Sequence, residues 1–256
     1  MTRLLTFALV LLAAVAPAGA QDSALDRGRA LLDAGTAAGS LDSLRQSRAV
    51  LGVAAAGDGA PAAWARYYQA VADYRIAYAL WGSDAPAAVR HAEQGAALVA
   101  ALADDGRSSD AMKAEAHALH ATLLGAQMGL DPTRSASLGP RAQAATAASL
   151  RLAPENPRVL LMSAASLLST PAEWGGDPTL ATRQLQAAAG RFAPAADPLA
   201  PTWGEGDVHA WLALAHLMAN DADAARPHVA RAAELQPGST FVQYKLQPWL
   251  AQLDAP

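Results

Sequence analysis

Two histidines spaced three residues apart are the residues best placed for metal chemistry. His117 and His120 share one face of a helix, and Glu115 lies close by. Imidazole and carboxylate groups gathered on one helical face can hold a divalent metal. The pair lacks the intervening glutamate of an H-E-x-x-H site, and the spacing supplies no third ligand. We therefore expect ordinary, partly buried histidines here, as for His209 and His216, and we predict no metal and no cofactor.

The sequence carries no recognisable catalytic motif. It contains no G-x-S-x-G elbow, no P-loop and no strand from which a dinucleotide-binding G-x-G-x-x-G could follow. Cysteine is absent, which removes disulfides and thiolate nucleophiles. The paired carboxylates Asp104-Asp105 and Asp221/Asp223 fall in turns or at helix starts, where solvated charge is the natural interpretation. We predict a protein that is not an enzyme and has no catalytic residue.

A tetrapeptide that combines an aromatic ring with an acid occurs twice, as Trp81-Gly82-Ser83-Asp84 and as Trp174-Gly175-Gly176-Asp177. A tryptophan face beside a carboxylate and exposed backbone could bind a small solute. We favour a structural role. The glycines permit positive φ, each aspartate caps the helix that follows, and each tryptophan covers the end of a helix pair.

Composition narrows the elements that could position these residues. The chain has 256 residues, of which 52% are hydrophobic, 16% charged and only 5% aromatic, so it is not intrinsically disordered. About a quarter of the residues are alanine, the best helix former, whereas sheet formers are sparse. The formal net charge of −4 argues against nucleic acid as a partner.

The N-terminus has the pattern of a signal peptide. Arg3 precedes an apolar run from Leu4 to Val15, and Ala18-Gly19-Ala20 provides a small-x-small cleavage site. The run is shorter than the ~20 residues that span a bilayer as a helix. We predict cleavage after Ala20, no membrane span after cleavage, and a periplasmic or secreted location. The alternative is an uncleaved N-terminal anchor.

Apolar residues and alanines then recur at three- and four-residue spacing, which predicts amphipathic helices joined by short loops. A Gly/Ala linker is expected at 52–61 and a long turn at 131–140, and the Pro/Gly-rich stretch 192–206 cannot be continuous helix. We expect helices at 23–34, 41–56, 62–80, 86–103, 110–129, 140–152, 157–169, 178–192, 207–219, 222–235 and 239–253.

The helices recur in pairs. The clearest pair reads His209-x2-Leu212-Ala213-x2-His216, then Ala225-x3-Val229-x2-Ala232-x4-Pro237. Units with partial matches start at Tyr67, Ala121 and Leu160, each with five additional residues between its two helices. Small residues such as Gly125, Ala164 and Ala213 are expected to let paired helices approach closely. Neither helix buries its face alone, so neighbouring pairs must stack.

These residues resemble the tetratricopeptide-repeat superfamily over roughly 62–237. The resemblance implies an all-α, right-handed α-solenoid with extended turns between paired helices and a concave groove that binds proteins or peptides. The extended turns are similar to those of periplasmic repeat proteins associated with TRAP-type transporters, although the lipobox cysteine is missing. The predicted organisation is a signal peptide (1–20), a degenerate helix pair and linker (21–61), repeats (62–237) and a C-terminal capping helix (238–256).

The resemblance also assigns four positions of each first helix to the groove. We call these the groove positions, and they are Ala65, Tyr68, Ala72, Arg75, Leu119, Thr122, Ala126, Gly129, Arg158, Leu161, Ala165, Leu168, Asp207, Ala210, Leu214 and Leu217. The lining is small and apolar with two arginines, which suits an extended or helical apolar peptide whose carboxylate Arg75 or Arg158 could bind.

The leading hypothesis is therefore a non-catalytic interaction scaffold in the cell envelope that binds a protein or peptide partner through Tyr68, Arg75, Thr122, Arg158, Ala165 and Leu214. The first alternative is a solute-binding accessory of a TRAP-type uptake system. A metal-dependent hydrolase built on the histidine pair is a third hypothesis. The groove could also be filled by the chain's own N-terminal or C-terminal helix.

Overall fold

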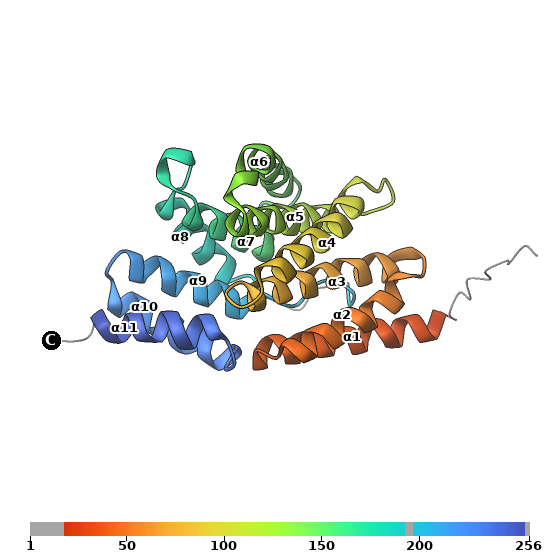
Figure 1. The fold of residues 1–256 in the computed structure, drawn as a ribbon, viewed down its shortest axis with the longest axis horizontal. Coiled ribbons are helices and arrows are strands. Elements are labelled where there is room, and N and C mark those ends of the chain that lie inside the picture. The colour runs from red at the N-terminus through yellow and green to blue at the C-terminus, as the bar shows by residue number, and fades with distance from the viewer. Residues whose placement is uncertain (1–17, 193–196, 254–256) are drawn as a thin grey trace, which may run out of the picture.

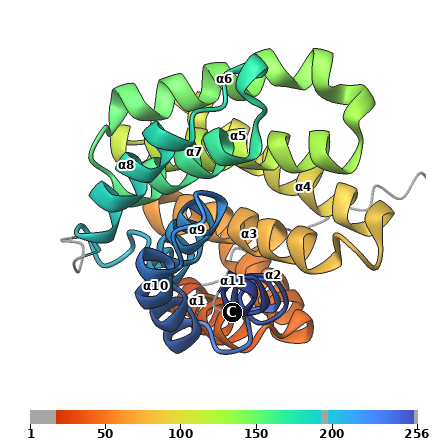
Figure 2. The same cartoon turned by 90° about the vertical axis from the view of Figure 1, so that its left-hand side faces the viewer.

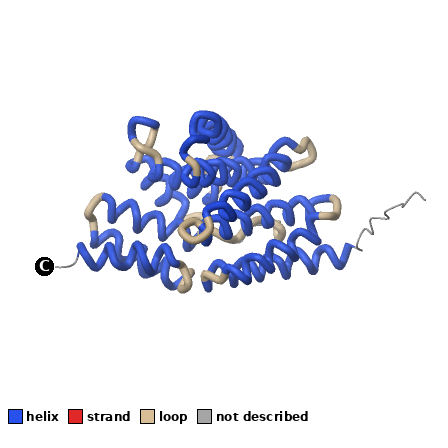
Figure 3. The backbone as a smooth tube through the Cα atoms, in the orientation of Figure 1, coloured by secondary structure: helices blue, strands red, loops and turns tan. Residues whose placement is uncertain are grey.

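The computed structural model describes residues 18–192 and 197–253, and this part of the chain contains helices and turns but no strand (Figure 3). The predicted all-α fold is confirmed. The α-helices are α1 (Ala18–Ala38), α2 (Leu41–Ala55), α3 (Gly59–Leu80), α4 (Ala85–Asp104), α5 (Asp110–Leu130), α6 (Ser135–Leu152), α7 (Pro157–Ser169), α8 (Pro178–Ala189), α9 (Glu205–Met218), α10 (Ala222–Leu235) and α11 (Gln247–Leu253). Short helical turns are η1 (Pro132–Arg134), η2 (Ala172–Trp174) and the π-helical η3 (Val242–Leu246).

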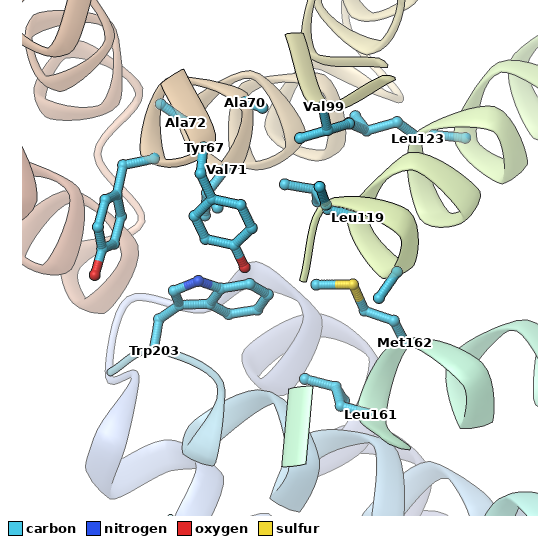
Figure 4. Close-up of a cluster of buried hydrophobic side chains, with 14 of the residues drawn as sticks. Tyr67, Ala70, Val71, Ala72, Val99, Leu119, Leu123, Leu161, Met162 and Trp203 are labelled. Atoms are coloured by element: carbon cyan, nitrogen blue, oxygen red, sulfur yellow. The ribbon is translucent and has the colours of Figure 1, made fainter. Parts of the chain in front are cut away.

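Consecutive helices pack as hairpins, α1 with α2 through α9 with α10, and the hairpins stack into an α-solenoid (Figures 1 and 2). The stacking is regular up to α6. Beyond it α7 pairs with α8, and of the preceding helices it packs more on α5 than on α6, so the regular stacking changes there. One apolar core runs through the stack from Leu25 to Ala215, and a smaller one joins α9, α10 and η3. Figure 4 shows the centre of the large core, where Tyr67, Leu119 and Met162 meet.

Three predicted boundaries were wrong. Helix α1 runs from Ala18 to Ala38, beyond the expected 23–34 at both ends. Helix α6 starts at Ser135 and contains Pro140, because buried Leu138 anchors its first turns and η1 leads directly into it. The linker expected at 52–61 shrinks to three residues, since α2 and α3 extend into it. Close to the expected 239–253, residues 240–253 are helical without a break, and the π-helical stretch η3 directly precedes α11, which contains Pro248.

The five additional residues between paired helices mostly lengthen the first helix. Helix α3 has 22 residues and α5 has 21, and only short turns follow them. Between α7 and α8 the insertion forms η2 instead. Ala164 and Ala213 are buried as expected, but Gly125 is not a packing position, because a Cβ there would meet no atom within 4 Å. The close approach occurs at Gly95, where a Cβ would lie 3.0 Å from the Cβ of Asp73.

The two ends of the solenoid meet along one edge (Figure 1). The Gly238 N–H, in the turn after α10, donates to the Ala37 carbonyl at 2.7 Å. A Cβ at Gly238 would lie 2.1 Å from the Ala38 carbonyl carbon, and a Cβ at Gly39 would lie 2.2 Å from the Gly238 oxygen. Gly39 also has φ +61°, the left-handed conformation that ends α1. Glycine at both positions therefore allows two segments of the main chain to lie in direct contact.

The predicted signal peptide lies mostly outside the described residues, and residues 18–20 form the start of α1. Its cleavage remains a prediction. Within the described ranges, no helix combines the length and apolarity needed to cross a membrane. The division of the chain into four regions also stays a prediction, although α1 and α2 share the apolar core of the later pairs.

Candidate binding site

A segment of the chain itself covers part of the predicted groove. We call residues 197–204, between α8 and α9, the inner segment. The Tyr68 hydroxyl donates to the Ala200 carbonyl at 3.0 Å, and Arg29 Nη1 donates to the Pro198 carbonyl at 2.8 Å. These bonds use main-chain carbonyls, which every residue offers to a donor. Burial raises the pKa of Tyr68 above its ordinary value, so its hydroxyl stays protonated and donates.

The inner segment ends in an aromatic anchor. Trp203 is only 9% exposed, lies beside Tyr67 in Figure 4, and has its ring centroid 6.5 Å from that of Tyr74. The Arg75 guanidinium lies 5.1 Å from the Tyr74 ring centroid and 5.3 Å from that of Trp203. Gly204 follows with φ +116°, a conformation that turns the chain into α9. An internal loop thus fills part of the groove, and the N-terminal helix α1 lies against the same face of α3, with the Arg29 guanidinium 5.0 Å from the Tyr68 ring centroid.

Arg75 is paired with a residue of α9. Both terminal nitrogens of Arg75 donate to the two carboxylate oxygens of Asp207 at 2.6 Å, and the side chains are only 12% and 10% exposed. Burial would lower the pKa of Arg75, but attraction and hydrogen bonds from Asp207 outweigh it and raise the pKa above its ordinary value. Gln236 adds a donor to Asp207 at 3.3 Å. This pair ties α3 to α9, two predicted groove walls.

Arg158 is likewise occupied. Its Nε donates to Glu115 at 2.7 Å, where Asn156 donates at 2.7 Å, and the Tyr67 hydroxyl donates to the other carboxylate oxygen at 2.8 Å. Burial, reinforced by the Glu115 charge, raises the pKa of Tyr67 well above its ordinary value. Sequence analysis placed Glu115 beside the histidines and indicated no pairing with Arg158. The usable signal was an acid that is followed by a largely apolar helical stretch.

The remaining predicted partner-binding residues lie in different environments. Leu214 is buried in the small core of α9, α10 and η3. Thr122 and Ala165 are half-buried, and the Thr122 hydroxyl donates to Ala118 within its own helix at 3.1 Å. Of the six residues, the structure therefore brings Tyr68 and Arg75 to the inner segment and leaves only Thr122 and Ala165 partly accessible. Their role in partner binding remains a prediction.

The two Trp-Gly-x-Asp turns share caps but not tryptophan environments. Asp84 accepts from the Ala87 N–H at 3.0 Å and Asp177 from the Leu180 N–H at 2.8 Å, which confirms both as N-caps. Of the three glycines in these turns, only Gly175 has the predicted positive φ, at +98°. Gly176 must be glycine because a Cβ would lie 1.8 Å from the Thr170 oxygen, whereas Gly82 faces open space.

The tryptophans of these turns differ in burial. Trp81 is partly buried, and its ring is tilted by 40° against that of Tyr78 with 5.3 Å between the centroids. A Cβ on Gly129 would lie 2.6 Å from the Trp81 ring. Trp174 is 66% exposed. The prediction that each tryptophan covers the end of a helix pair therefore holds for Trp81 and is wrong for Trp174.

The histidines form two groups. His117 and His120 line a cleft of about 280 Å³ between α4 and α6, and burial lowers the pKa of both. His209 and His228 lie with their Nδ1 atoms 2.9 Å apart, and His216 stacks on His228. Burial and the two neighbouring imidazoles lower the pKa of His228 to about 4. In the ranges that the structure describes, no group of three or more such ligands is arranged to hold a metal ion.

A second and larger cleft lies on the outside of the solenoid, between α2 and α4, with α3 as its base. Its volume is about 610 Å³, and its polar residues include Arg48, Arg66, Gln69 and Gln94. The α4 face from Ala97 to Leu102 supplies an apolar wall. We call this site the outer cleft.

A buried carboxylate holds one arginine of the outer cleft in place. Asp73 is fully buried, and its Oδ1 accepts from Arg48 Nε at 2.5 Å and contacts His91 Nδ1 at 2.6 Å. Arg48 Nη2 donates to Gln94 at 2.8 Å. Sequence reasoning missed this site. The polar residues at 66, 69 and 73, which share one face of an otherwise apolar helix, were a usable signal.

Neither a family model nor a curated protein matches this sequence. Among solved structures, the chain is similar to the HusA haemophore from Porphyromonas gingivalis, with 23% identity, a TM-score of 0.58, and coverage of 76% of this chain and 91% of that one. It is also similar to an assembly chaperone of RpL4, Acl4 (residues 1–338), with 17% identity, a TM-score of 0.41, and coverage of 91% and 96%. The HusA likeness shows the fold alone.

Proposed function

We propose that the protein is a non-catalytic interaction scaffold that binds an extended segment of a partner protein along the groove positions. The observation that carries the proposal is the inner segment, which Tyr68 and Arg29 hold through main-chain carbonyls. Such contacts do not depend on the side chains of the bound segment, so another extended chain can make them. The inner segment then acts as an internal occupant that a partner displaces.

The apolar neighbourhood of this segment supports the same role. Trp203 packs among aromatic and aliphatic residues, and Leu199 is half-buried against the core. A partner segment with a large aromatic and small apolar residues would reproduce those contacts, and its carbonyls would accept from the same donors. The N-terminal signal pattern supports an envelope or secreted location, which predicts a mature chain starting at Gln21 when its mass is measured in the native host.

The experiment is affinity capture from envelope extracts of the native host with three baits. The first is the mature wild-type chain, the second has residues 197–203 replaced by a seven-residue Gly/Ser linker, and the third combines that linker with Tyr68→Phe. We expect the second bait to enrich a specific partner most strongly and the third to lose much of that gain. Equal capture by all three baits would refute binding at the groove positions.

A second candidate, a solute-binding accessory protein, is favoured by the outer cleft, whose volume falls in the ~300–1,000 Å³ range of small-molecule sites. HusA, which shares the fold, is named a haemophore, so a small-ligand role has a precedent on this scaffold. The test is a thermal-shift screen of the mature chain against a broad metabolite panel. A reproducible rise in melting temperature supports this role, and the absence of any shift argues against it.

A further inference from the structure

We infer that the outer cleft is a binding site for a small amphipathic carboxylate, with the carboxylate between Arg48 and Arg66 and the apolar portion along α4. This inference rests on the second candidate function and names its ligand class. It is independent of the inner segment, which lies against Tyr68 and Arg29 and not in this cleft.

The positive charge of the cleft is held in position before a ligand arrives. Arg48 donates from Nε to Asp73 and from Nη2 to Gln94. Within the described ranges, no residue accepts a hydrogen bond from Arg48 Nη1. Arg66 is fixed differently, by donation from Nη2 to the Gly57 carbonyl at 2.9 Å. Two guanidinium groups from different helices thus keep donors available at one cleft. A guanidinium donor favours a carboxylate or phosphate through charge-assisted hydrogen bonds.

The neighbouring amides are also donors. Because Gln94 Oε1 accepts from Arg48, its Nε2 remains as the donor of that amide. Gln69 Nε2 lies where a Cβ on Gly52 would be 3.2 Å away, so the glycine leaves room for this amide. Asp105 is the acidic residue of the cleft, and Arg107 compensates it with Nη2 at 2.9 Å and Nε at 3.1 Å. The donor-rich lining therefore selects an anion.

The rest of the lining determines what the anion carries. Ala97, Leu98, Ala101 and Leu102 form a ridge of methyl and isobutyl groups along α4. A ligand that is charged throughout would leave this ridge in contact with water. A carboxylate on a short aliphatic chain satisfies both halves of the cleft, because its head meets the guanidinium donors while its tail buries apolar surface.

The test uses isothermal titration calorimetry of the mature chain with octanoate. We expect one binding site. Arg48→Gln and Arg66→Gln should each lower the affinity for octanoate about ten-fold or more, because each removes one charge-assisted contact. Arg183→Gln removes the same charge from α8, away from the cleft, and should leave the affinity unchanged. Octyltrimethylammonium, which has the same tail with a cationic head, should not bind. Circular dichroism melts verify that each variant is folded.

Three results would overturn the inference: no octanoate binding at millimolar concentration, equal affinity in both arginine variants, or equally strong binding of the cation. The metabolite screen separates this failure from failure of the second candidate function. A panel compound that shifts the melting temperature while octanoate fails refutes the ligand class alone. If no compound shifts it, the solute-binding role fails as well.

Discussion

The Arg75–Asp207 pair provides the sharpest energetic test of the structure, because it joins two helices 132 residues apart in sequence. Both contacts measure 2.6 Å and both side chains are at most 12% exposed. Removing one member leaves an uncompensated buried charge, which costs about 3–5 kcal/mol. We therefore expect Asp207→Asn and Arg75→Gln each to lower the free energy of unfolding by that amount, a large share of the ~5–15 kcal/mol typical of a domain.

The double variant Arg75→Met/Asp207→Leu separates pairing from packing. Replacing a buried pair by apolar residues of similar volume is often nearly neutral, so the double variant should be more stable than either single one. Urea unfolding followed by circular dichroism measures all of them. Arg191→Gln, which removes an ion pair with 41% and 81% exposed side chains, should cause no measurable loss. Single-variant losses below about 1 kcal/mol would refute a desolvated link between α3 and α9.

Three further predictions concern other parts of the fold. Gly238→Ala places a methyl group against the main chain of α1 and should cost about 1–3 kcal/mol in a thermal melt, whereas Gly106→Ala, with no atom within 4 Å of its Cβ, should leave the melting temperature almost unchanged. The pKa of His228 is lowered to about 4 in the folded chain, so the unfolded chain binds a proton at higher pH. The free energy of unfolding should therefore fall by about 1–2 kcal/mol, after solvent screening, as the pH drops from about 6.5 to 4. His228→Gln should flatten this part of the stability profile, measured by urea titrations at several pH values. Trp81→Ala should lower the free energy of unfolding by about 2–3 kcal/mol, whereas Trp174→Ala, which removes a 66% exposed ring, should change it by less than about 0.5 kcal/mol. Equal losses for the two variants in calorimetry would contradict the different environments of the two tryptophans.

Local features of the fold followed directly from the sequence. The three- and four-residue spacing of alanines and larger apolar residues placed most helices within a few residues, because that spacing sets which face each helix buries. The caps at Asp84 and Asp177 followed from their position before a helix-starting proline or alanine. Pro140 lies inside α6 and does not start it, because the burial of Leu138 holds the preceding residues in the helix.

Features that depend on superhelical curvature could not be predicted in this way. Repeat spacing assigns Tyr68 and Arg75 to the groove, but it does not indicate that residues about 130 positions later reach them. The contact of Gly238 with α1 is of the same kind, since it depends on the summed rotation of every helix pair. The outer cleft could not be predicted from the sequence, because Arg48 lies in the helix pair whose repeat register the sequence leaves open.

The proposed function requires that the groove positions bind an extended chain through its backbone. The direct measurement uses the variant in which residues 197–203 are replaced by a Gly/Ser linker. A synthetic peptide with the sequence of residues 197–203 is added at up to millimolar concentration, and nuclear magnetic resonance detects its binding. We expect saturable shifts at residues around Tyr68, and Tyr68→Phe should weaken the binding that causes them. A folded linker variant whose spectrum the peptide does not change would contradict the proposed function.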